Sequence, residues 1–488
     1  MDFGKTERRW SALALIVTAQ FMVILDVAIV NVALPSIKSD LGFSQTNLQW
    51  VISAYAILFG GALLLGGRLA DLLGRRRLFV AGLALFAASS LMCGLAWSEG
   101  SLIGFRALQG LGGALLAPAA LSLLMTTFAE GRERNLALGI YGAASGSGAA
   151  AGVLLGGVLT SYLSWSWIFF INVPVGALVI GLTPVLLRES RADLGHRHFD
   201  FAGAGSITAG LMLLVYALTR ATQHGWATLE TIGLLAASAA LVASFFVVEL
   251  RSKAPLLPLR IFRLRTLSAS NVSGLLMGSA IFSQFFLLTL YMQQVLHYSA
   301  LKTGVAYIGL TLTIIAFSAV AQALVTRIGV RRVLPVGLAL STAALVLFAR
   351  LPVHGHYFAD LFPAFIISGL GLALAFVPMS IGALTGVSEG EAGIASGLIN
   401  TTQQIGGAIG VAVATTIATT FTTNYVGAHV GVTPFSGPAL THGFEIAFYV
   451  LAVLAGLGAL LSAVMLESKP ADPVAEVVPE QEFELEAA

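Results

Sequence analysis

Charged side chains are scarce in this chain of 488 residues: they make up 10% of it, against about a quarter in a typical soluble domain. Hydrophobic residues account for 57%. That much apolar surface cannot be hidden inside one water-soluble core, and a lipid bilayer is the solvent that accepts it. The composition therefore predicts an integral membrane protein.

The motifs of several reaction classes are also missing. The single cysteine, Cys93, allows neither an intramolecular disulfide nor a thiolate metal cluster. No Gly-x4-Gly-Lys-Ser/Thr run is present, so ATP-driven transport has no support in the sequence. No cluster of histidine, cysteine and carboxylate residues has metal-ligand spacing, and no nucleophile lies beside a candidate base. We predict no enzyme activity, no metal site, no cofactor and no nucleic-acid partner.

Long apolar runs fill most of the chain, and a helix that crosses a bilayer needs about 20 apolar residues. The first run, Trp10 to Val32, is too long for a cleaved signal peptide and is expected to stay in the membrane. Most connections are short, so successive helices should be antiparallel neighbours. The pattern predicts an all-α membrane protein with fourteen transmembrane helices, near residues 11–35, 48–69, 78–97, 101–127, 136–161, 166–187, 201–219, 228–250, 267–292, 302–326, 333–350, 357–382, 394–423 and 443–466.

The basic residues test this arrangement independently. If the N-terminus is placed in the cytoplasm and the spans alternate, 21 of the 26 basic residues lie in cytoplasmic segments. Lys38, Arg220, Lys302 and Arg350 are left outside, and Arg106 lies inside a span. The positive-inside rule predicts this asymmetry. We therefore expect a multi-pass protein of the cell membrane with both termini in the cytoplasm.

A weak internal repeat divides the chain. Gly67 to Arg77 follows the second span and Gln322 to Arg332 follows the tenth, and the two segments align at a leucine, a glycine and two arginines. Spans 1–6 and 9–14 are therefore predicted to form two parallel six-helix bundles, with spans 7 and 8 inserted between them. The predicted organisation is a cytoplasmic N-terminus at 1–10, an N-terminal bundle at 11–187, cytoplasmic loops with the two inserted helices at 188–265, a C-terminal bundle at 266–466 and a disordered acidic cytoplasmic tail at 467–488.

One acid, Asp26, interrupts the first span, where a charge is costly and is a functional candidate by default. At about 1.5 Å per residue it lies about 22 Å from the cytoplasmic edge near Ser11, or about 8 Å below the outer edge of the apolar core. Arg106 enters the fourth span from outside and reaches a similar depth. If the two side chains share a cavity, the arginine favours the charged form of the acid, whereas burial favours the neutral form. Conformation or substrate could then switch the acid between the two forms, as proton coupling requires. The alternative is a static ion pair that fixes helix packing.

The fifth span carries a regular glycine pattern. Gly148, Gly152 and Gly156 repeat at every fourth residue and predict a smooth face on which another helix packs closely. Fixed packing and a sliding interface both suit such a face. A dinucleotide-binding fingerprint is excluded, because the spacing is wrong and no βαβ unit surrounds it. Gly139 and Gly157 complete the predicted helix-packing set.

An acid lies among arginines at the cytoplasmic end of the second span. The arginines alone suit anchoring at the inner membrane surface. The position of Asp71 favours a sharper hypothesis, a charge latch whose carboxylate accepts hydrogen bonds from an arginine or a helix N-terminus and holds the two halves in one state. The predicted latch residues are Gly67, Asp71, Gly74, Arg75 and Arg76.

Several uncharged amides fall inside predicted spans. Such side chains either line a cavity or bond to a neighbouring helix, and the sequence leaves both possibilities open. The candidates for a substrate cavity are Asn31, Asn271, Gln284, Asn400, Gln403 and Gln404.

Four segments resemble motifs of the major facilitator superfamily, specifically its fourteen-span drug:proton antiporter branch, and the resemblance covers nearly the whole chain. Leu25 to Pro35 is similar to the branch's first-helix motif, whose acid is implicated in proton coupling. Gly67 to Arg77 matches the superfamily's motif between helices 2 and 3. Leu102 to Gly113 resembles the fourth-helix motif, whose arginine, here Arg106, is associated with proton transfer. Trp165 to Gly176 is typical of the sixth helix.

Two positions depart from the pattern of that branch. Its fifth-helix signature normally has a proline after the glycine that is Gly152 here, and this chain has Val153. Valine keeps the backbone hydrogen bond that proline removes, so we expect a weaker bend. Ser166 lies between two tryptophans where the family usually has arginine.

The resemblance implies a proton-coupled exporter of drugs or an antibiotic that works by alternating access of two rocking halves, with the proton gradient as its energy source. Its expected partners are a small lipophilic or amphiphilic substrate, protons and membrane lipid, and a monomer is expected. A lipid or metabolite flippase or a proton symporter of the same fold remains an alternative. A non-transporting membrane receptor or scaffold is the alternative from another class.

Overall fold

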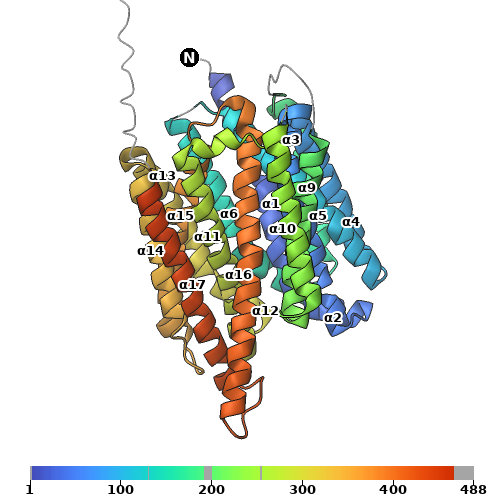
Figure 1. Ribbon diagram of the computed structural model, residues 1–488, viewed down its shortest axis with the longest axis vertical. Coiled ribbons are helices and arrows are strands. Elements are labelled where there is room, and N and C mark those ends of the chain that lie inside the picture. The colour runs from blue at the N-terminus through green and yellow to red at the C-terminus, as the bar shows by residue number, and fades with distance from the viewer. Residues whose placement is uncertain (1–2, 130, 192–199, 253–254, 467–488) are drawn as a thin grey trace, which may run out of the picture.

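The computed structural model describes residues 3–129, 131–191, 200–252 and 255–466, so the predicted tail at 467–488 lies outside the described residues. Within these ranges the chain forms helices and no strand (Figure 1). The elements are α1 (Phe3–Leu41), α2 (Gln45–Leu48), α3 (Trp50–Leu73), α4 (Arg75–Gly94), α5 (Glu99–Thr127), α6 (Arg132–Tyr162), α7 (Trp167–Phe170), α8 (Asn172–Leu186), α9 (Phe201–His224), α10 (Leu229–Arg251), η1 (Leu259–Arg263), α11 (Arg265–Leu290), η2 (Tyr291–Val295), α12 (Ala300–Ala306), α13 (Ile308–Ile328), α14 (Val330–Phe348), η3 (Tyr357–Leu361), α15 (Phe362–Leu384), η4 (Glu389–Glu391), α16 (Ala392–Ala428) and α17 (Gly437–Met465).

Apolar helices account for every predicted span, which confirms the predicted fold class. Thirteen described segments are long and apolar enough to cross a membrane, and the two arms of α6 make a fourteenth. The largest difference is in length: α1 continues past Pro35 to Leu41, although the first span was predicted to end at residue 35. Neighbouring helices can satisfy the backbone groups that a proline frees, so a proline does not have to end a membrane helix.

α6 bends in its glycine-rich middle, where a weaker bend was expected in the absence of the family's proline. The arms Arg132–Gly148 and Ala151–Tyr162 meet at 41°, although Val153 occupies the proline position. Glycines at and beside the junction weaken the resistance of the helix to bending, because they contribute no side-chain packing along the helix surface. The bend therefore arises without the proline.

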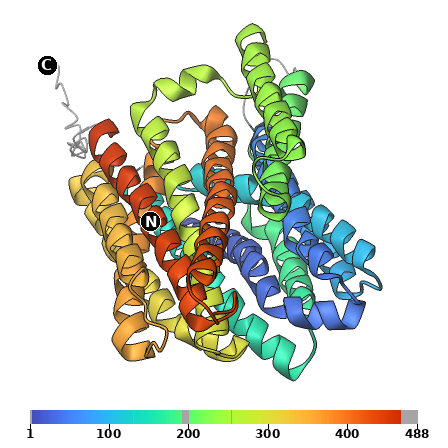
Figure 2. The same ribbon diagram turned by 60° about the horizontal axis from the view of Figure 1, so that its bottom comes forward.

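The helices pack in two groups, which lie side by side in Figure 2, one coloured blue to teal and the other yellow to red. In the first group α3 and α4 pack on α5, and α1 packs on α6. In the second group α11 packs on α16, and α14 packs on α15 and α17. The inserted helices α9 and α10 pack on each other, and α9 also contacts both α3 and α16. The inserted pair therefore flanks the boundary between the groups.

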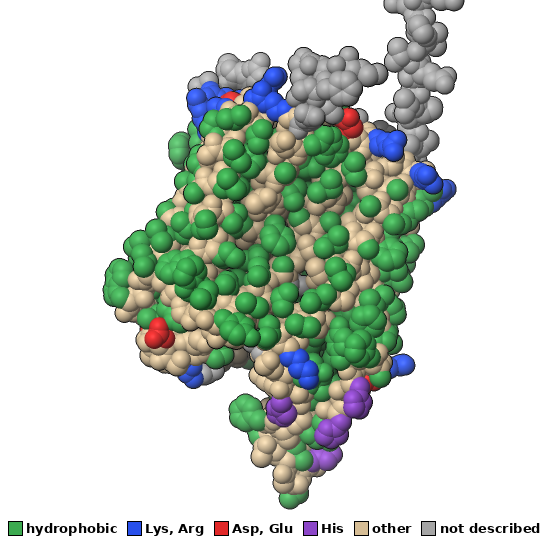
Figure 3. Space-filling model, turned by 180° about the vertical axis from the view of Figure 1, so that it is seen from behind, with side chains coloured by type: hydrophobic (Ala, Val, Ile, Leu, Met, Phe, Trp, Pro, Cys, Tyr) green, Lys and Arg blue, Asp and Glu red, His purple; other side chains and the backbone are tan. Residues whose placement is uncertain are grey.

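Basic side chains gather at one end of the bundle, the end at which α1 begins and α17 finishes (Figure 3). We call this the basic end and the opposite one the far end. The starts of α4, α6 and α14 and the last turns of α10 and α13 all bring arginines to the basic end. Midway between the two ends the face in Figure 3 shows many hydrophobic side chains and no charged ones, as expected for contact with lipid.

Two pairs of helices form the main contacts between the groups. α3 packs on α16, and α6 packs on α13. We call these the α3–α16 seam and the α6–α13 seam. In the internal repeat α3 corresponds to α13 and α6 corresponds to α16, so the two seams are pseudo-symmetric counterparts.

Candidate functional site

A buried ion pair joins α1 and α5. Arg106 Nη1 donates to Asp26 Oδ2 at 2.6 Å, and the two side chains are 1% and 0% exposed. The sequence placed them at one depth and left their relative direction open. The packing of α1 against α5 brings the two side chains into contact. Each charge is therefore paired at a depth where an unpaired charge would be strongly destabilising.

Two buried amides complete the hydrogen bonding of the Asp26 carboxylate. Gln109 Nε2 and Asn172 Nδ2 both donate to Asp26 Oδ1, at 2.8 and 3.0 Å. Gln109 lies one turn after Arg106 on α5 and accepts a hydrogen bond from Arg106 Nη1 at 2.7 Å. Asn172 is the first residue of α8. The carboxylate is thus held by three side chains from two helices other than its own.

The guanidinium of Arg106 is held equally firmly. Its Nε donates to the Val51 carbonyl at 3.0 Å, and its Cζ lies 4.3 Å from the centre of the Tyr55 ring and 5.7 Å from that of Phe169. Asn172 Nδ2 also donates to Ser90 Oγ, at 3.0 Å, which links the cluster to α4. Residues of α1, α3, α4, α5, α7 and α8 therefore meet at this one site.

A change in the charge of Asp26 would be felt by all of these helices. A proton on the carboxyl would remove the attraction to Arg106 and would replace an acceptor by a donor facing the Gln109 and Asn172 amides. Loss of one member of a buried pair costs several kilocalories per mole, so the cluster would have to rearrange. Among the described residues, no group of three or more His, Cys, Asp or Glu could hold a metal ion.

Sequence reasoning missed Gln109 and Asn172 as members of this site. Both lie inside the segments that carry the family resemblance, but neither is charged, so the search for intramembrane charges passed over them. A usable signal existed for Gln109, because residues three apart on a helix share a face and Arg106 lies three residues earlier. Asn172 offered no such signal, since only the docking of α8 on α1 and α4 brings it to Asp26.

The small-residue face of α6 packs against α1, the helix that carries Asp26. A Cβ added at Gly152 would lie 2.7 Å from the Leu25 carbonyl oxygen, and one added at Gly156 would lie 2.9 Å from that of Ile29. One added at Gly148 would lie 3.0 Å from Ile24. The remaining glycines of the predicted set differ: Gly157 is buried, and Gly139 faces Gln322 of α13.

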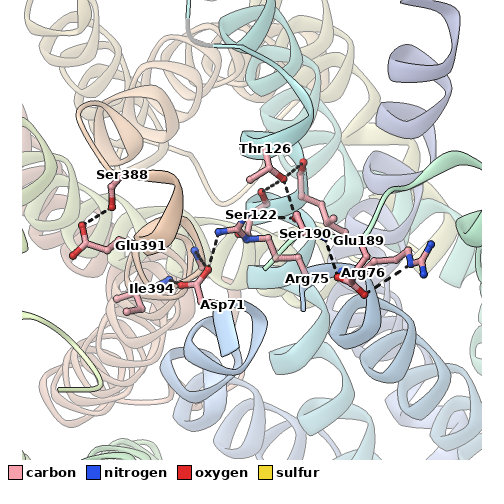
Figure 4. A network of polar contacts seen from close by, with 12 residues as sticks. Asp71, Arg75, Arg76, Ser122, Thr126, Glu189, Ser190, Ser388, Glu391 and Ile394 are labelled. Atoms are coloured by element: carbon pink, nitrogen blue, oxygen red, sulfur yellow. Dashed lines mark hydrogen bonds and ion pairs between the residues drawn. The ribbon is translucent and has the colours of Figure 1, made fainter. Parts of the chain in front are cut away.

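The carboxylate of Asp71 contacts both kinds of donor that the latch hypothesis named (Figure 4). Arg75 Nη2 donates to Asp71 Oδ1 at 3.0 Å, from one turn later in the sequence. The backbone N–H groups of Gly393 and Ile394 donate to Oδ1 and Oδ2 at 3.1 and 3.2 Å. These groups belong to the first turn of α16, which has unpaired N–H groups and the positive end of the helix dipole. Asp71 therefore links the two groups of helices at the basic end.

Two latch positions, Gly67 and Gly74, have backbone geometry that suits glycine. A Cβ at Gly67 would lie 2.4 Å from the Gly393 carbonyl oxygen, so α3 and α16 are in backbone contact just below the carboxylate. Gly74 joins α3 to α4 with φ of 109°, a conformation that other residues rarely adopt. Both positions require glycine for a local geometric reason.

Arg76 lies away from Asp71, beside an acid that sequence reasoning missed. The backbone N–H groups of Arg76 and Arg77 donate to Glu189 Oε1 and Oε2 at 3.1 and 3.2 Å, so Glu189 caps the start of α4 (Figure 4). The Arg76 side chain donates to the Leu187 carbonyl at 3.3 Å. Glu189 follows the sixth span among basic residues, and only the fold places it at a helix N-terminus.

Two of the six candidate cavity amides bond to a neighbouring helix. Asn271 Oδ1 accepts from Thr402 Oγ1 at 3.2 Å, and Gln284 Nε2 donates to Ser368 Oγ at 2.8 Å, in both cases between helices of the second group. Asn31 and Asn400 donate to carbonyls of their own helices. Gln403 and Gln404 are half-buried on α16. The contacts of Asn271 and Gln284 are those of the packing alternative.

The chain matches the family model for the Major Facilitator Superfamily over residues 16–411. It is 41% identical over 409 residues to the puromycin resistance protein pur8 of Streptomyces alboniger, covering 83% of this chain and 81% of that protein. It is 40% identical over 408 residues to the cephamycin export protein CmcT of Amycolatopsis lactamdurans, covering 83% and 84% of the two chains. It is 36% identical over 409 residues to the tetracenomycin C resistance and export protein of Streptomyces glaucescens, covering 83% and 75%.

A solved structure has the same fold. The crystal structure of the human organic anion transporter MFSD10 superimposes with a TM-score of 0.66 at 16% sequence identity, covering 93% of this chain and 99% of that one. Together with the family match, the helical architecture establishes that this chain is a multi-pass membrane protein belonging to the major facilitator superfamily.

Proposed function

We propose that this chain exports a small lipophilic or amphiphilic compound, such as an antibiotic, in exchange for protons. The observation that carries the proposal is the Asp26–Arg106 pair. It is the ion pair that lies deep among the described spanning helices, and its carboxylate joins residues of several helices through direct contacts. A proton that binds there would alter the packing of the whole first group, which is what coupling to a conformational change requires.

In this proposal the basic end faces the cytoplasm, in keeping with the positive-inside rule. The carboxylate of Asp71 and the contact of Gly67 with Gly393 hold the halves together at that end. The structure then represents the state in which the cytoplasmic gate is closed. Entry of substrate from the cytoplasm requires these contacts to break.

The substrate class rests on the relatives. Three of them are named for resistance to or export of different antibiotics, and each covers about four fifths of this chain. A single ion pair deep in the described spans offers little counter-charge for a divalent cation, so neutral or monovalent compounds are the better candidates. A sensitivity panel of antibiotics and dyes in cells with and without the gene product identifies the substrate.

Purified protein in vesicles with an imposed pH gradient tests proton coupling. Asp26→Asn is expected to abolish substrate accumulation driven by the gradient, while exchange of labelled for unlabelled substrate without a gradient continues. Glu230→Gln is the matched control, because Glu230 is 45% exposed at the far end and pairs only with Arg220 in the contacts observed. Unchanged gradient-driven transport by Asp26→Asn would refute the proposal.

Reversing the sign of the pH gradient separates export from uptake. An antiporter accumulates substrate when the vesicle interior is acidic, and a symporter does so when the exterior is acidic. Failure of every gradient to move any compound of the panel would instead favour a receptor or scaffold.

A further inference from the structure

In the second half of the internal repeat, a neutral residue occupies the position equivalent to Asp71. Aligning Gly74 with Gly329 and Arg76 with Arg331 puts Thr326 of α13 at the position of Asp71. The same alignment puts Val330 at the position of Arg75. The second half has therefore lost both charges of the latch while keeping the turn that holds them, since Gly329 also has a positive φ, of 82°.

Thr326 nevertheless bonds across the boundary, as Asp71 does. Asn135 Nδ2, near the start of α6, donates to Thr326 Oγ1 at 3.3 Å. Gln322, one turn earlier on α13, donates to the same oxygen from its Nε2 at 3.0 Å. Thus one donor from its own half and one from the opposite half share this oxygen, just as the Arg75 guanidinium and the Gly393 backbone N–H share Asp71 Oδ1.

The two seams also differ in how closely their helices approach, and the seam with the charged latch has the closer contact at its glycine. In the α3–α16 seam a Cβ at Gly67 would meet backbone at 2.4 Å, whereas in the α6–α13 seam a Cβ at Gly139 would lie 3.1 Å from the Gln322 side chain. At these two glycines α3 and α16 are in backbone contact, whereas a side chain lies between α6 and α13.

We propose that Asn135 and Thr326 form a second, uncharged latch, and that the gate at the basic end is closed by two unequal contacts. They are positioning residues that set how tightly the gate closes. The charged latch contributes two bonds from backbone N–H groups to a carboxylate, while the neutral latch contributes one amide–hydroxyl bond, which is weaker. The inference deepens the proposed function, since it assigns residues to the gate of the same transport cycle.

Distances between spin labels in purified protein test the proposal without any transport assay. Cys93 is the single native cysteine and is buried, so cysteines introduced at Arg132 and Ile328, both exposed at the basic end, can be labelled selectively. Thr326→Val keeps the side-chain shape and removes the acceptor. It is expected to raise the ratio of open to closed gate by about two- to tenfold, the effect of one hydrogen bond of ordinary net strength.

Matched variants separate this effect from a general loss of packing. Thr326→Ser keeps the hydroxyl and should leave the ratio unchanged. Asn135→Leu should raise it as Thr326→Val does, and the two changes together should give no more than either alone, because both remove the same bond. Thr326→Val combined with Asp71→Asn should multiply the separate effects, because the two bonds belong to different seams.

Two results would overturn the second latch: an unchanged ratio in Thr326→Val, or multiplying effects of Thr326→Val and Asn135→Leu. Neither result bears on proton coupling, because the labels report the gate and not Asp26. Conversely, unchanged transport in Asp26→Asn would refute the export proposal. The label distances would still test the second latch.

Discussion

A buried charge is stable only with its partner, and this governs the behaviour of Asp26 and Arg106. Both side chains are fully enclosed, and every hydrogen bond to the Asp26 carboxylate comes from an equally buried group. Removing one partner leaves an uncompensated charge and costs about 3–5 kcal/mol, whereas removing both can cost much less. Variants that neutralise Asp26, Arg106 or both should therefore differ in stability.

Neutralising both members of the pair distinguishes coupling from static packing. Asp26→Asn and Arg106→Gln are each expected to lower the melting temperature of the detergent-purified protein, and the double variant should recover much of that loss. If the pair only fixes helix packing, the double variant also recovers transport. We expect it to recover stability but not transport driven by a pH gradient, because no titratable group is left at that position.

At the scale of the helices, α6 packs closely on α1, the helix that carries Asp26. Its glycines face the α1 backbone on both sides of Asp26, at Leu25 and Ile29. Close packing of two helices through small residues relies on van der Waals contact and leaves no room for a larger side chain. The close approach of α1 and α6 on both sides of Asp26 thus depends on these glycines.

Gly152→Val should disrupt this contact. The first added atom alone would lie 2.7 Å from the Leu25 carbonyl oxygen, so α1 and α6 have to separate or shift. Transport in cells should fall to background, with lower thermal stability of the purified protein. Gly181→Val is the control, because nothing lies within 4 Å of a Cβ at that position of α8. Equal transport by the two variants would show that α1 and α6 do not depend on this close contact.

At the scale of the whole molecule, the balance between closed and open states depends on contacts at the basic end. The Asp71 carboxylate accepts two hydrogen bonds from the first turn of α16, at the positive end of the helix dipole, which favours a negative charge there. Surface ion pairs at the same end, such as Arg260 with Glu391, contribute less because water screens them. One buried carboxylate should therefore dominate the stability of the closed gate.

Asp71→Asn should open the gate without unfolding the protein. Loss of the charge at a partly buried helix terminus costs up to about 2 kcal/mol, which is a change of up to about thirtyfold in the ratio of open to closed states. Distances between spin labels at the two sides of the boundary measure it. Glu391→Gln is the control and should change the ratio little. A larger effect from Glu391→Gln than from Asp71→Asn would contradict this account.

Several elements could be predicted from the sequence because the bilayer imposes strong local rules. The fourteen spans follow from apolar length alone, and the ends of α1 and α16 were missed because a proline or a polar turn does not have to end a membrane helix. Asp26, Arg106 and Asp71 were found because a charge in or beside an apolar run stands out. Gln109, Asn172 and Glu189 were not, because their importance depends on which helix lies beside them.

The sequence by itself determined that this protein is a helical membrane protein, how many times it crosses, which end carries the arginines and which acids are candidates for its chemistry. These properties depend on neighbouring residues and on the solvent, and both act on each helix separately. Only the tertiary structure decided that Arg106 reaches Asp26, that Asp71 caps α16 and that Thr326 meets Asn135. Those contacts join residues far apart in the chain, and they depend on the rotation and tilt of each helix, which packing alone sets.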